Sequence, residues 1–261
     1  MLNQLSLAAV AAAAAGGGGV RPLHGSYCFA GLPGTVHGLF GLPPLGAALP
    51  ADVLPPMRRV QRVVLVLVDA FGWRLFEQLA DRVPFLRDRL ADSVVSQLTA
   101  QFPSTTAAHI TCLHSGQPAG VSGVHEWFYY EPEVDAVIAP LLYAYAGDGG
   151  RDTLARFGVR PELLLPPSLY PGLAQAGVNA HIFQLREYAY SAYSRWITRG
   201  ARLHAYSTLP EALINLEIEL ERAPAPAYFV LYFDALDAHG HHYGSHARQV
   251  EAEALALFRS L

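Results

Sequence analysis

Two apolar runs that each end in a carboxylate most constrain what this chain can fold into. Residues 63–68 are all valine or leucine and lead to Asp69, and residues 228–233 are aromatic or aliphatic and lead to Asp234. Such runs predict strands buried on both faces, as in a parallel sheet covered by helices. Ligands of open α/β sheets bind outside the carboxyl ends of the strands, so Asp69 is a candidate ligand or catalytic acid. Helix capping in a βα turn is the alternative role for Asp69.

Composition indicates a globular protein with a sizeable core. The chain has 261 residues, 52% of them hydrophobic, which is enough for one large domain or two small ones. A net charge of -4 offers no basic stripe of the kind that binds nucleic acid. Cys28 and Cys112 are too few for a disulfide framework and are expected to be reduced, buried thiols. No apolar stretch reaches the roughly 20 residues of a membrane span, and no basic residue precedes the apolar start, so we expect a cytoplasmic protein without a membrane span.

The first 58 residues are expected to form a leader that differs from the rest of the chain. Residues 1–20 are Ala-rich and contain four consecutive glycines, whereas residues 21–56 are dense in Gly and Pro with little periodicity. This pattern predicts a flexible start, followed by an irregular segment that wraps over the surface of the domain. The folded α/β domain is expected to cover residues 59–261.

Helix and strand signals alternate through the predicted domain, and this βαβ rhythm favours a mainly parallel sheet. Residues 125–140 are expected to form a hairpin or an aromatic-rich covering insertion, and residues 188–196 a loop that faces substrate or packs on the surface. The helices are predicted over residues 73–80, from Pro84 to Leu90, and over 169–176, 209–222 and 246–261. The strands that follow the first apolar run are predicted over residues 93–99, 180–183 and 228–234.

The segment 102–116 contains a candidate anion site. It passes from a strand end through a Pro turn into a predicted helix, which places Thr105 and Thr106 at a helix N-terminus. Backbone N–H groups and the helix dipole favour an anion there, so a phosphate held against a hydroxyl is one interpretation. The other is that one threonine is simply the N-cap of the helix.

The segment 234–244 contains two acids, three histidines and two glycines directly after a predicted strand. Neutral imidazoles together with carboxylates are the usual ligands of zinc or a similar divalent ion. The glycines allow the backbone to come close to such an ion. A run of solvated histidines is the alternative interpretation.

These segments together resemble the alkaline phosphatase superfamily, and within it the type I phosphodiesterase/nucleotide pyrophosphatase family. Members of that family have an apolar strand that ends in a metal-binding Asp, and residues 63–69 resemble it. They have a Phe-Pro-Ser-x-Thr segment whose last Thr is the nucleophile, and residues 102–106 are similar. They also have an Asp-x-x-Gly-His-x-x-Gly segment, which residues 237–244 match at every fixed position.

The resemblance implies an alkaline phosphatase-like three-layer α/β sandwich with a mainly parallel sheet. It assigns Thr106 as nucleophile and metal ligand, Asp69 as a ligand of the same metal, and Asp237 and His241 as ligands of a second metal. His109 stands where the family usually carries an Asn that donates to a phosphate oxygen. We expect an imidazole N–H of His109 to make that contact instead.

The family also supplies an Asp-His pair from a Ser-Asp-His-Gly segment and one more distant His, and residues 245–261 are too short to contain the strands that carry them. We therefore expect a fold that is incomplete at the C-terminus, as in a fragment or a truncated gene product. Two protein ligands for each metal also fall short of the three usual at a catalytic zinc.

The resemblance implies hydrolysis of phosphodiester or nucleotide pyrophosphate bonds through a phosphothreonine intermediate, with two divalent metal ions, zinc before others. The expected partner is a small-molecule phosphodiester or nucleotide, and the oligomeric state stays open. Alternatives are phosphomonoester hydrolysis on the same fold and a non-catalytic relic with a binding role. Sulfatase chemistry is disfavoured because the Thr106 segment lacks a Cys/Ser-x-Pro-x-Arg setting, and a serine hydrolase because no Gly-x-Ser-x-Gly elbow is present.

Overall fold

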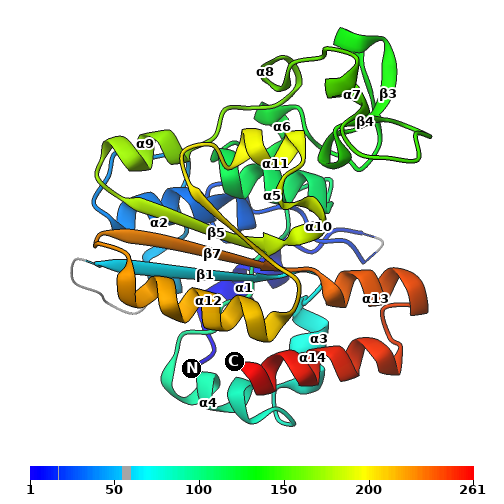
Figure 1. The fold of residues 1–261 in the computed structure, drawn as a ribbon. Helices are drawn as coiled ribbons and strands as arrows, with labels where there is room; N and C mark the ends of the chain where they lie inside the picture. The colour runs from blue at the N-terminus through cyan, green and yellow to red at the C-terminus, as the bar shows by residue number, and fades with distance from the viewer. Residues whose placement is uncertain (17, 55–59) are drawn as a thin grey trace.

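The computed structural model describes residues 1–16, 18–54 and 60–261, and shows helices on both sides of a central sheet (Figure 1). The strand order of this sheet is β1-β7-β5-β6, and all three pairings are parallel. The predicted α/β fold with a mainly parallel sheet is therefore confirmed. The four strands are β1 Arg62–Val68, β5 Asn179–Leu185, β6 Arg202–Tyr206 and β7 Ala227–Phe233.

Alternate residues of the buried strands build two separate cores, one on each face of the sheet. Phe183 and Phe229 belong to the core beneath α3, α4, α12 and α14, whereas Ile182 and Val230 belong to the core beneath α2, α5 and α9. These helices are α2 Leu32–Leu39, α3 Trp73–Leu79, α4 Pro84–Asp92, α5 Thr106–Ser115, α9 Tyr170–Gln175, α12 Leu209–Arg222 and α14 Arg248–Ser260. The predicted helices over 73–80, 84–90, 169–176, 209–222 and 246–261 are thus confirmed.

Shorter elements complete the described chain. A small antiparallel sheet confirms the hairpin expected over residues 125–140 and extends it by a third strand. Its strands are β2 Tyr129–Glu131, β3 Ala136–Ala139 and β4 Ala144–Tyr145. The other helices are α1 Gln4–Ala12, α6 Ala119–Ser122, α7 Thr153–Arg156, α8 Pro161–Leu164, α10 Arg186–Ala189, α11 Ala192–Ile197 and α13 Ala235–Tyr243, with 3₁₀ turns η1 Phe29–Gly31, η2 Ala51–Val53, η3 Pro132–Val134 and η4 Pro140–Leu142.

The prediction of a flexible and irregular leader is wrong where α1 and α2 form. Asn3 begins α1 as its N-cap, because its side-chain oxygen accepts hydrogen bonds from the N–H groups of Leu5 and Ser6. Backbone hydrogen bonds also fasten this segment to the domain, since Asn3 N donates to Val95 O over 2.9 Å. The expected boundary between residues 58 and 59 lies outside the described residues.

The strand predicted over residues 93–99 does not join the central sheet. Val95 and Thr99 make isolated parallel bridges with Leu2 and Cys28 of the N-terminal segment. Residues 93–99 therefore pair with the N-terminal segment and not with the central sheet. Local periodicity predicts an extended segment but does not identify its pairing partner.

The loop expected over residues 188–196 is instead largely helical. Ser191 caps α11 by accepting a hydrogen bond from Ser194 N over 3.1 Å, and Tyr193 and Ile197 are buried on the inner face of this helix. Capping and burial therefore favour a helix where the aromatic composition suggested a loop.

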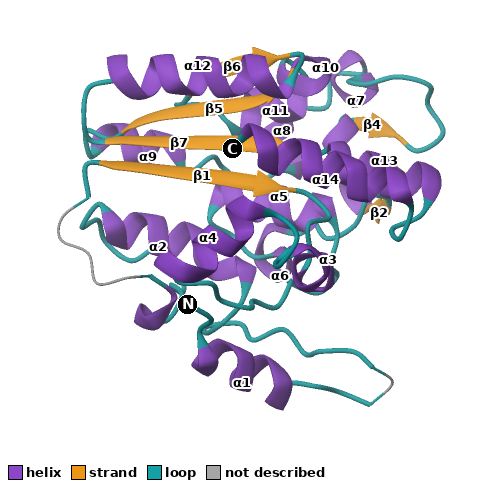
Figure 2. Cartoon of the chain, turned by 90° about the horizontal axis from the view of Figure 1, so that it is seen from below, coloured by secondary structure: helices purple, strands orange, loops and turns teal. Residues whose placement is uncertain are grey.

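Strand β1 is less buried than its apolar sequence predicts. Val63, Leu65 and Leu67 pack against the core beneath α2, but Val64 and Val66 are 43% and 36% exposed. α12 packs on β5, β6 and β7 and leaves this face of β1 uncovered, as the view from below shows (Figure 2). The prediction of burial on both faces is confirmed for β7 and wrong for β1.

Cys28 and Cys112 are buried and unpaired with each other, as expected for reduced thiols. Within the residues that the structure describes, none of the helices has both the length and the apolar character that a membrane span needs.

Candidate active site

The site begins at the carboxyl ends of two neighbouring strands. Val68, the last residue of β1, pairs with Phe233, the last residue of β7. Asp69 and Asp234 are the residues that directly follow these two strands. Asp69 N also donates to Phe233 O over 2.9 Å. Because parallel strands end at the same edge, the fold places both acids at the crevice where α/β proteins bind ligands.

Asp69 accepts hydrogen bonds from three different groups. Its Oδ2 accepts from the Thr106 hydroxyl at 3.2 Å and from the Tyr232 hydroxyl at 2.6 Å, and its Oδ1 accepts from Ala70 N at 3.0 Å. Asp69 does not cap the following helix, since Gly72 occupies the N-cap position of α3. Its carboxylate is instead directed toward Thr106 at the start of α5.

The two threonines at the start of α5 have different roles. Thr105 is the N-cap, and its Oγ1 accepts a hydrogen bond from Ala108 N at 3.2 Å and donates to His125 O at 3.0 Å. Thr106 is the first residue of the helix, and its hydroxyl donates to Asp69. The N-cap interpretation is therefore confirmed for Thr105, whereas the anion site at Thr106 stays a prediction.

His109 does not offer the N–H expected of it. Its Nε2 accepts a hydrogen bond from Gln101 N at 3.0 Å, and its Nδ1 lies 2.7 Å from Thr105 O, to which it donates. Burial lowers the pKa of His109, which favours this neutral form. Because both ring nitrogens are engaged by backbone groups, His109 holds residues 101–105 in place and is not arranged to contact a phosphate oxygen.

Asp237 and His241 lie together on α13, one helical turn apart. Asp237 Oδ2 is 3.5 Å from His241 Nε2, and the His241 side chain is 83% exposed. The pKa of Asp237 is raised, first by burial and then by the negative charges of Asp69 and Asp234, while His241 lowers it. Three carboxylates therefore repel one another at this edge of the sheet, which is an environment that a bound cation stabilises.

Two cavities meet at Thr106 and Asp237, which line both of them. The first is a cavity of 390 Å³ on the Asp69 side, and the second is a cavity of 220 Å³ on the side of α11 and the small antiparallel sheet. The first cavity is also lined by Phe29, Asp69, Phe71 and His109. The second cavity is also lined by Trp127, Arg151, Tyr188, Tyr193 and Asp234. The second cavity is thus lined by Thr106, by aromatic side chains and by Arg151, which is paired with Glu187 at 3.1 Å.

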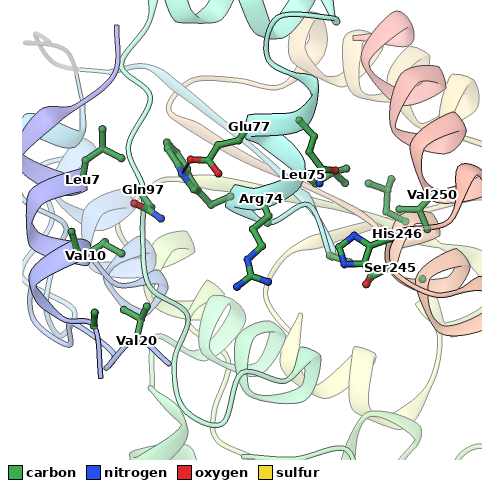
Figure 3. A pocket seen from close by; sticks show the side chains of 18 residues that line it. Leu7, Val10, Val20, Arg74, Leu75, Glu77, Gln97, Ser245, His246 and Val250 are labelled. Atoms are coloured by element: carbon green, nitrogen blue, oxygen red, sulfur yellow. Dashed lines mark hydrogen bonds between the residues drawn. The ribbon is translucent and has the colours of Figure 1, made fainter. Parts of the chain in front are cut away.

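A larger cavity of 820 Å³ lies between α1, α3 and the start of α14. Arg74 extends across its opening, with Glu77 and Gln97 on one side and His246 on the other (Figure 3). The five residues predicted for the site lie outside its lining, so size alone does not identify the functional cavity here.

Within the residues that the structure describes, one group of three or more His, Cys, Asp or Glu residues brings its ligand atoms within 4.8 Å of one another, and it is formed by His181, His204 and Glu219. The residues predicted as metal ligands, Asp69, Asp237 and His241, do not form such a group. His181, His204 and Glu219 belong to β5, β6 and α12, and sequence reasoning did not select them. The three residues are far apart in the chain, so they do not form a local sequence motif that would predict a metal site.

Sequence reasoning also missed two polar contacts of the site. Tyr232 donates to Asp69, and Tyr188 donates to Asp234 over 2.7 Å. The sequence gives a weak indication that Asp234 belongs to the site, since Asp234 follows an apolar run just as Asp69 does. The two phenols gave no signal because tyrosines in apolar runs are usually assigned to the core.

Comparison with known proteins places this geometry in context. A model of the Type I phosphodiesterase / nucleotide pyrophosphatase family matches residues 63–257. Among solved structures, murine ectonucleotide pyrophosphatase / phosphodiesterase 5 is similar at 16% identity, with a TM-score of 0.56 over 77% of this chain and 50% of that chain. An inactive variant of the murine protein, in which a threonine is replaced by alanine, is solved in complex with AMP and is similar at 15% identity and a TM-score of 0.56, over the same 77% and 50% of the two chains.

Phosphonoacetate hydrolase from Sinorhizobium meliloti is also similar, at 13% identity and a TM-score of 0.50 over 76% of this chain and 52% of that chain. The chain therefore spans about half the length of the solved structures it matches. At these identities the likeness concerns the fold, which is the alkaline phosphatase-like α/β fold. The curated proteins contain no match to this chain.

Proposed function

Because the chain belongs to the type I phosphodiesterase / nucleotide pyrophosphatase family, we propose that it hydrolyses phosphodiester or nucleotide pyrophosphate bonds with Thr106 as the nucleophile. One observation carries the proposal: the Thr106 hydroxyl lies at the N-terminus of α5 and donates to Asp69. The inactive threonine-to-alanine variant of the murine relative gives independent support for a threonine nucleophile.

The proposed reaction has two steps. Thr106 Oγ attacks phosphorus, a new O–P bond forms, and the bond from phosphorus to the departing alcohol or phosphate breaks. Asp69 Oδ2 orients the hydroxyl and is placed to receive its proton, while the first N–H groups of α5 face the anionic phosphoryl group. Water then hydrolyses the phosphothreonine and releases Thr106.

The residues present suit divalent cations at this edge of the sheet. Asp69 with Thr106, and Asp237 with His241, would hold one ion each, and zinc is the ion that mixed imidazole and carboxylate ligands favour. When bound, such ions lower the pKa of a coordinated hydroxyl and neutralise charge on the departing oxygen. Burial and the charges of Asp69 and Asp234 raise the pKa of Asp237, and a bound cation would offset this effect.

A nucleotide is the substrate class that the neighbouring cavity supports best. Trp127 and Tyr188 offer aromatic surface in the cavity that Thr106 also lines. Arg151, which is paired with Glu187 at 3.1 Å in this structure, would have to exchange this carboxylate for a phosphate of the substrate. The AMP complex of the murine relative supports the same class.

The test measures turnover of a bis-aryl phosphate diester and of an aryl phosphate monoester by the zinc-loaded chain. We expect faster turnover of the diester, and a loss of at least about a thousand-fold in kcat/KM in Thr106→Ala. Thr105→Ser is the matched control, because it keeps the capping hydroxyl and should retain activity.

Two outcomes would contradict the proposal. Faster turnover of the monoester would favour a phosphomonoesterase on the same fold. Full activity in Thr106→Ala, or neither metal binding nor turnover in the unaltered chain, would remove Thr106 as nucleophile or support the non-catalytic alternative. Treatment with a chelator should abolish turnover, and added zinc should restore it.

A further inference from the structure

A second group of metal-binding side chains lies away from Thr106, on the side of the sheet that faces α12. His181 comes from the first half of β5, His204 from the edge strand β6, and Glu219 from α12. His181 shares its face of β5 with Phe183, which belongs to the core beneath α12. The active-site acids follow the carboxyl ends of β1 and β7, so this second group lies on different strands and at a different position along the sheet.

The ligand atoms of this group are close together. His181 Nδ1 lies 3.1 Å from His204 Nε2 and 3.3 Å from Glu219 Oε2, and one ligand atom of each residue lies within 4.8 Å of the others. A tetrahedral zinc with bonds of about 2.0–2.1 Å holds its ligand atoms roughly 3.3 Å apart. The two distances from His181 therefore approach the separation of ligand atoms around a tetrahedral zinc.

The surroundings hold these side chains in position. His181 is 1% exposed and stacks on Phe229, and the ring of His204 stacks on Phe183 with centroids 4.5 Å apart. The Glu219 side chain is 22% exposed, which leaves a route for an ion and for water. Two imidazoles fixed by aromatic stacking and one carboxylate form the His₂Glu ligand set that zinc uses in proteins.

We infer that His181, His204 and Glu219 form a second, independent site for a divalent transition metal, zinc before others, that fastens the edge strand β6 and helix α12 to β5. Water would complete its coordination. The ion would add a link between α12 and the paired strands β5 and β6, so its expected effect is on stability and not on turnover.

The positive charge of Arg202 should weaken metal binding at this group, and removing the charge provides a test. Arg202 lies opposite His181 in the register of β5 and β6, and two residues before His204 on the same strand face. Its guanidinium repels a cation at the group. Arg202→Gln should therefore tighten metal binding, whereas a cluster held only by hydrogen bonds gives no such increase.

The experiment uses the full chain with Asp69→Asn and Asp237→Asn, which removes carboxylate ligands from the active site. Cobalt(II) is titrated into the metal-free protein, visible absorption reports four-coordinate cobalt, and thermal unfolding is followed with and without zinc. We expect one equivalent of cobalt to bind with tetrahedral bands, and zinc to raise the unfolding temperature.

Glu219→Gln should weaken this binding by at least about 100-fold, because even partners that only orient a ligand contribute about 10- to 100-fold. Glu219 is partly exposed, so this variant is suited to retain the fold even if His204→Phe does not. His24→Gln replaces an exposed histidine elsewhere and is the matched control. Absence of cobalt binding, or equal binding by Glu219→Gln and the control, would overturn the inference.

Discussion

At the scale of single residues, the contacts of Asp69 define the candidate active site. Burial, followed by the charge of Asp69, raises the pKa of the Tyr232 phenol far above its ordinary value, so this hydroxyl keeps its proton and donates to Asp69. The hydrogen bond fixes the orientation of a carboxylate that also accepts from Thr106. In the proposed reaction, Tyr232 is thus a positioning residue for Asp69.

Tyr232→Phe should lower kcat/KM by about 10- to 100-fold and weaken metal binding at the active site, because Asp69 loses the donor that orients it. KM and kcat measured across a range of zinc concentrations test this. Tyr188→Phe is the matched control, since Tyr188 donates to Asp234 instead. Unchanged zinc dependence in Tyr232→Phe would show that Asp69 does not need this hydrogen bond.

His114 is expected to make the stability of the protein depend on pH. Burial lowers the pKa of His114 from 6.5 to about 4, and its Nδ1 lies 2.5 Å from the Tyr170 hydroxyl. Between these two pH values the unfolded chain binds a proton that the folded chain excludes, so stability falls as the pH falls from 6.5 to 4. The shift corresponds to about 3 kcal/mol of unfolding free energy.

Urea unfolding at several pH values between 4 and 8 measures this effect. His114→Asn keeps a polar group near Tyr170 but does not titrate, so its unfolding free energy should change less between pH 6.5 and pH 4 than that of the unaltered chain. Equal slopes in the two proteins would show that other groups produce the acid sensitivity.

At the scale of helices and strands, the sequence predicts elements whose signals are local. α12 begins and ends at the predicted residues because Thr208 caps its start, Pro210 fits its first turn and its apolar face is regular. Asp69 and Asp237 could be brought together from sequence because each follows or lies near the end of a sheet strand, whereas the strand predicted before Thr106 does not join the central sheet. The partners of residues 93–99 and the cluster around His181 depend on contacts between distant segments, which periodicity does not encode.

The N-cap of α5 allows a direct test of how an element positions the site. Thr105→Ala removes the acceptor for Ala108 N and the donor to His125 O, and should lower the free energy of unfolding by about 1–2 kcal/mol. Loosening of the first turn should also reduce turnover, because Thr106 belongs to that turn.

Denaturant unfolding together with kcat measurements tests this expectation. Thr105→Ser keeps the hydroxyl and should retain both stability and turnover. Equal stability in the alanine variant would show that another group satisfies the helix end.

At the scale of the whole molecule, the most unusual feature is the exposed edge of the central sheet. The described sheet ends at β1, a strand made almost entirely of valine and leucine, and the face that carries Val64 and Val66 is largely uncovered. Edge strands with apolar side chains and unpaired backbone groups tend to pair with other strands. The solved structures that this chain resembles are about twice as long as the segment they share with it.

We expect the purified chain to self-associate through β1 as its concentration rises. Val64→Lys should reduce this association, because a charge on an apolar edge strand opposes pairing with a second copy, while the parallel pairing of β1 with β7 is retained. Sedimentation velocity over a concentration series measures the effect. Val121→Lys introduces the same charge at an exposed valine on α6, and should leave association unchanged. A concentration-independent monomer in the unaltered chain, or equal loss of association in both variants, would show that β1 does not mediate contact between copies.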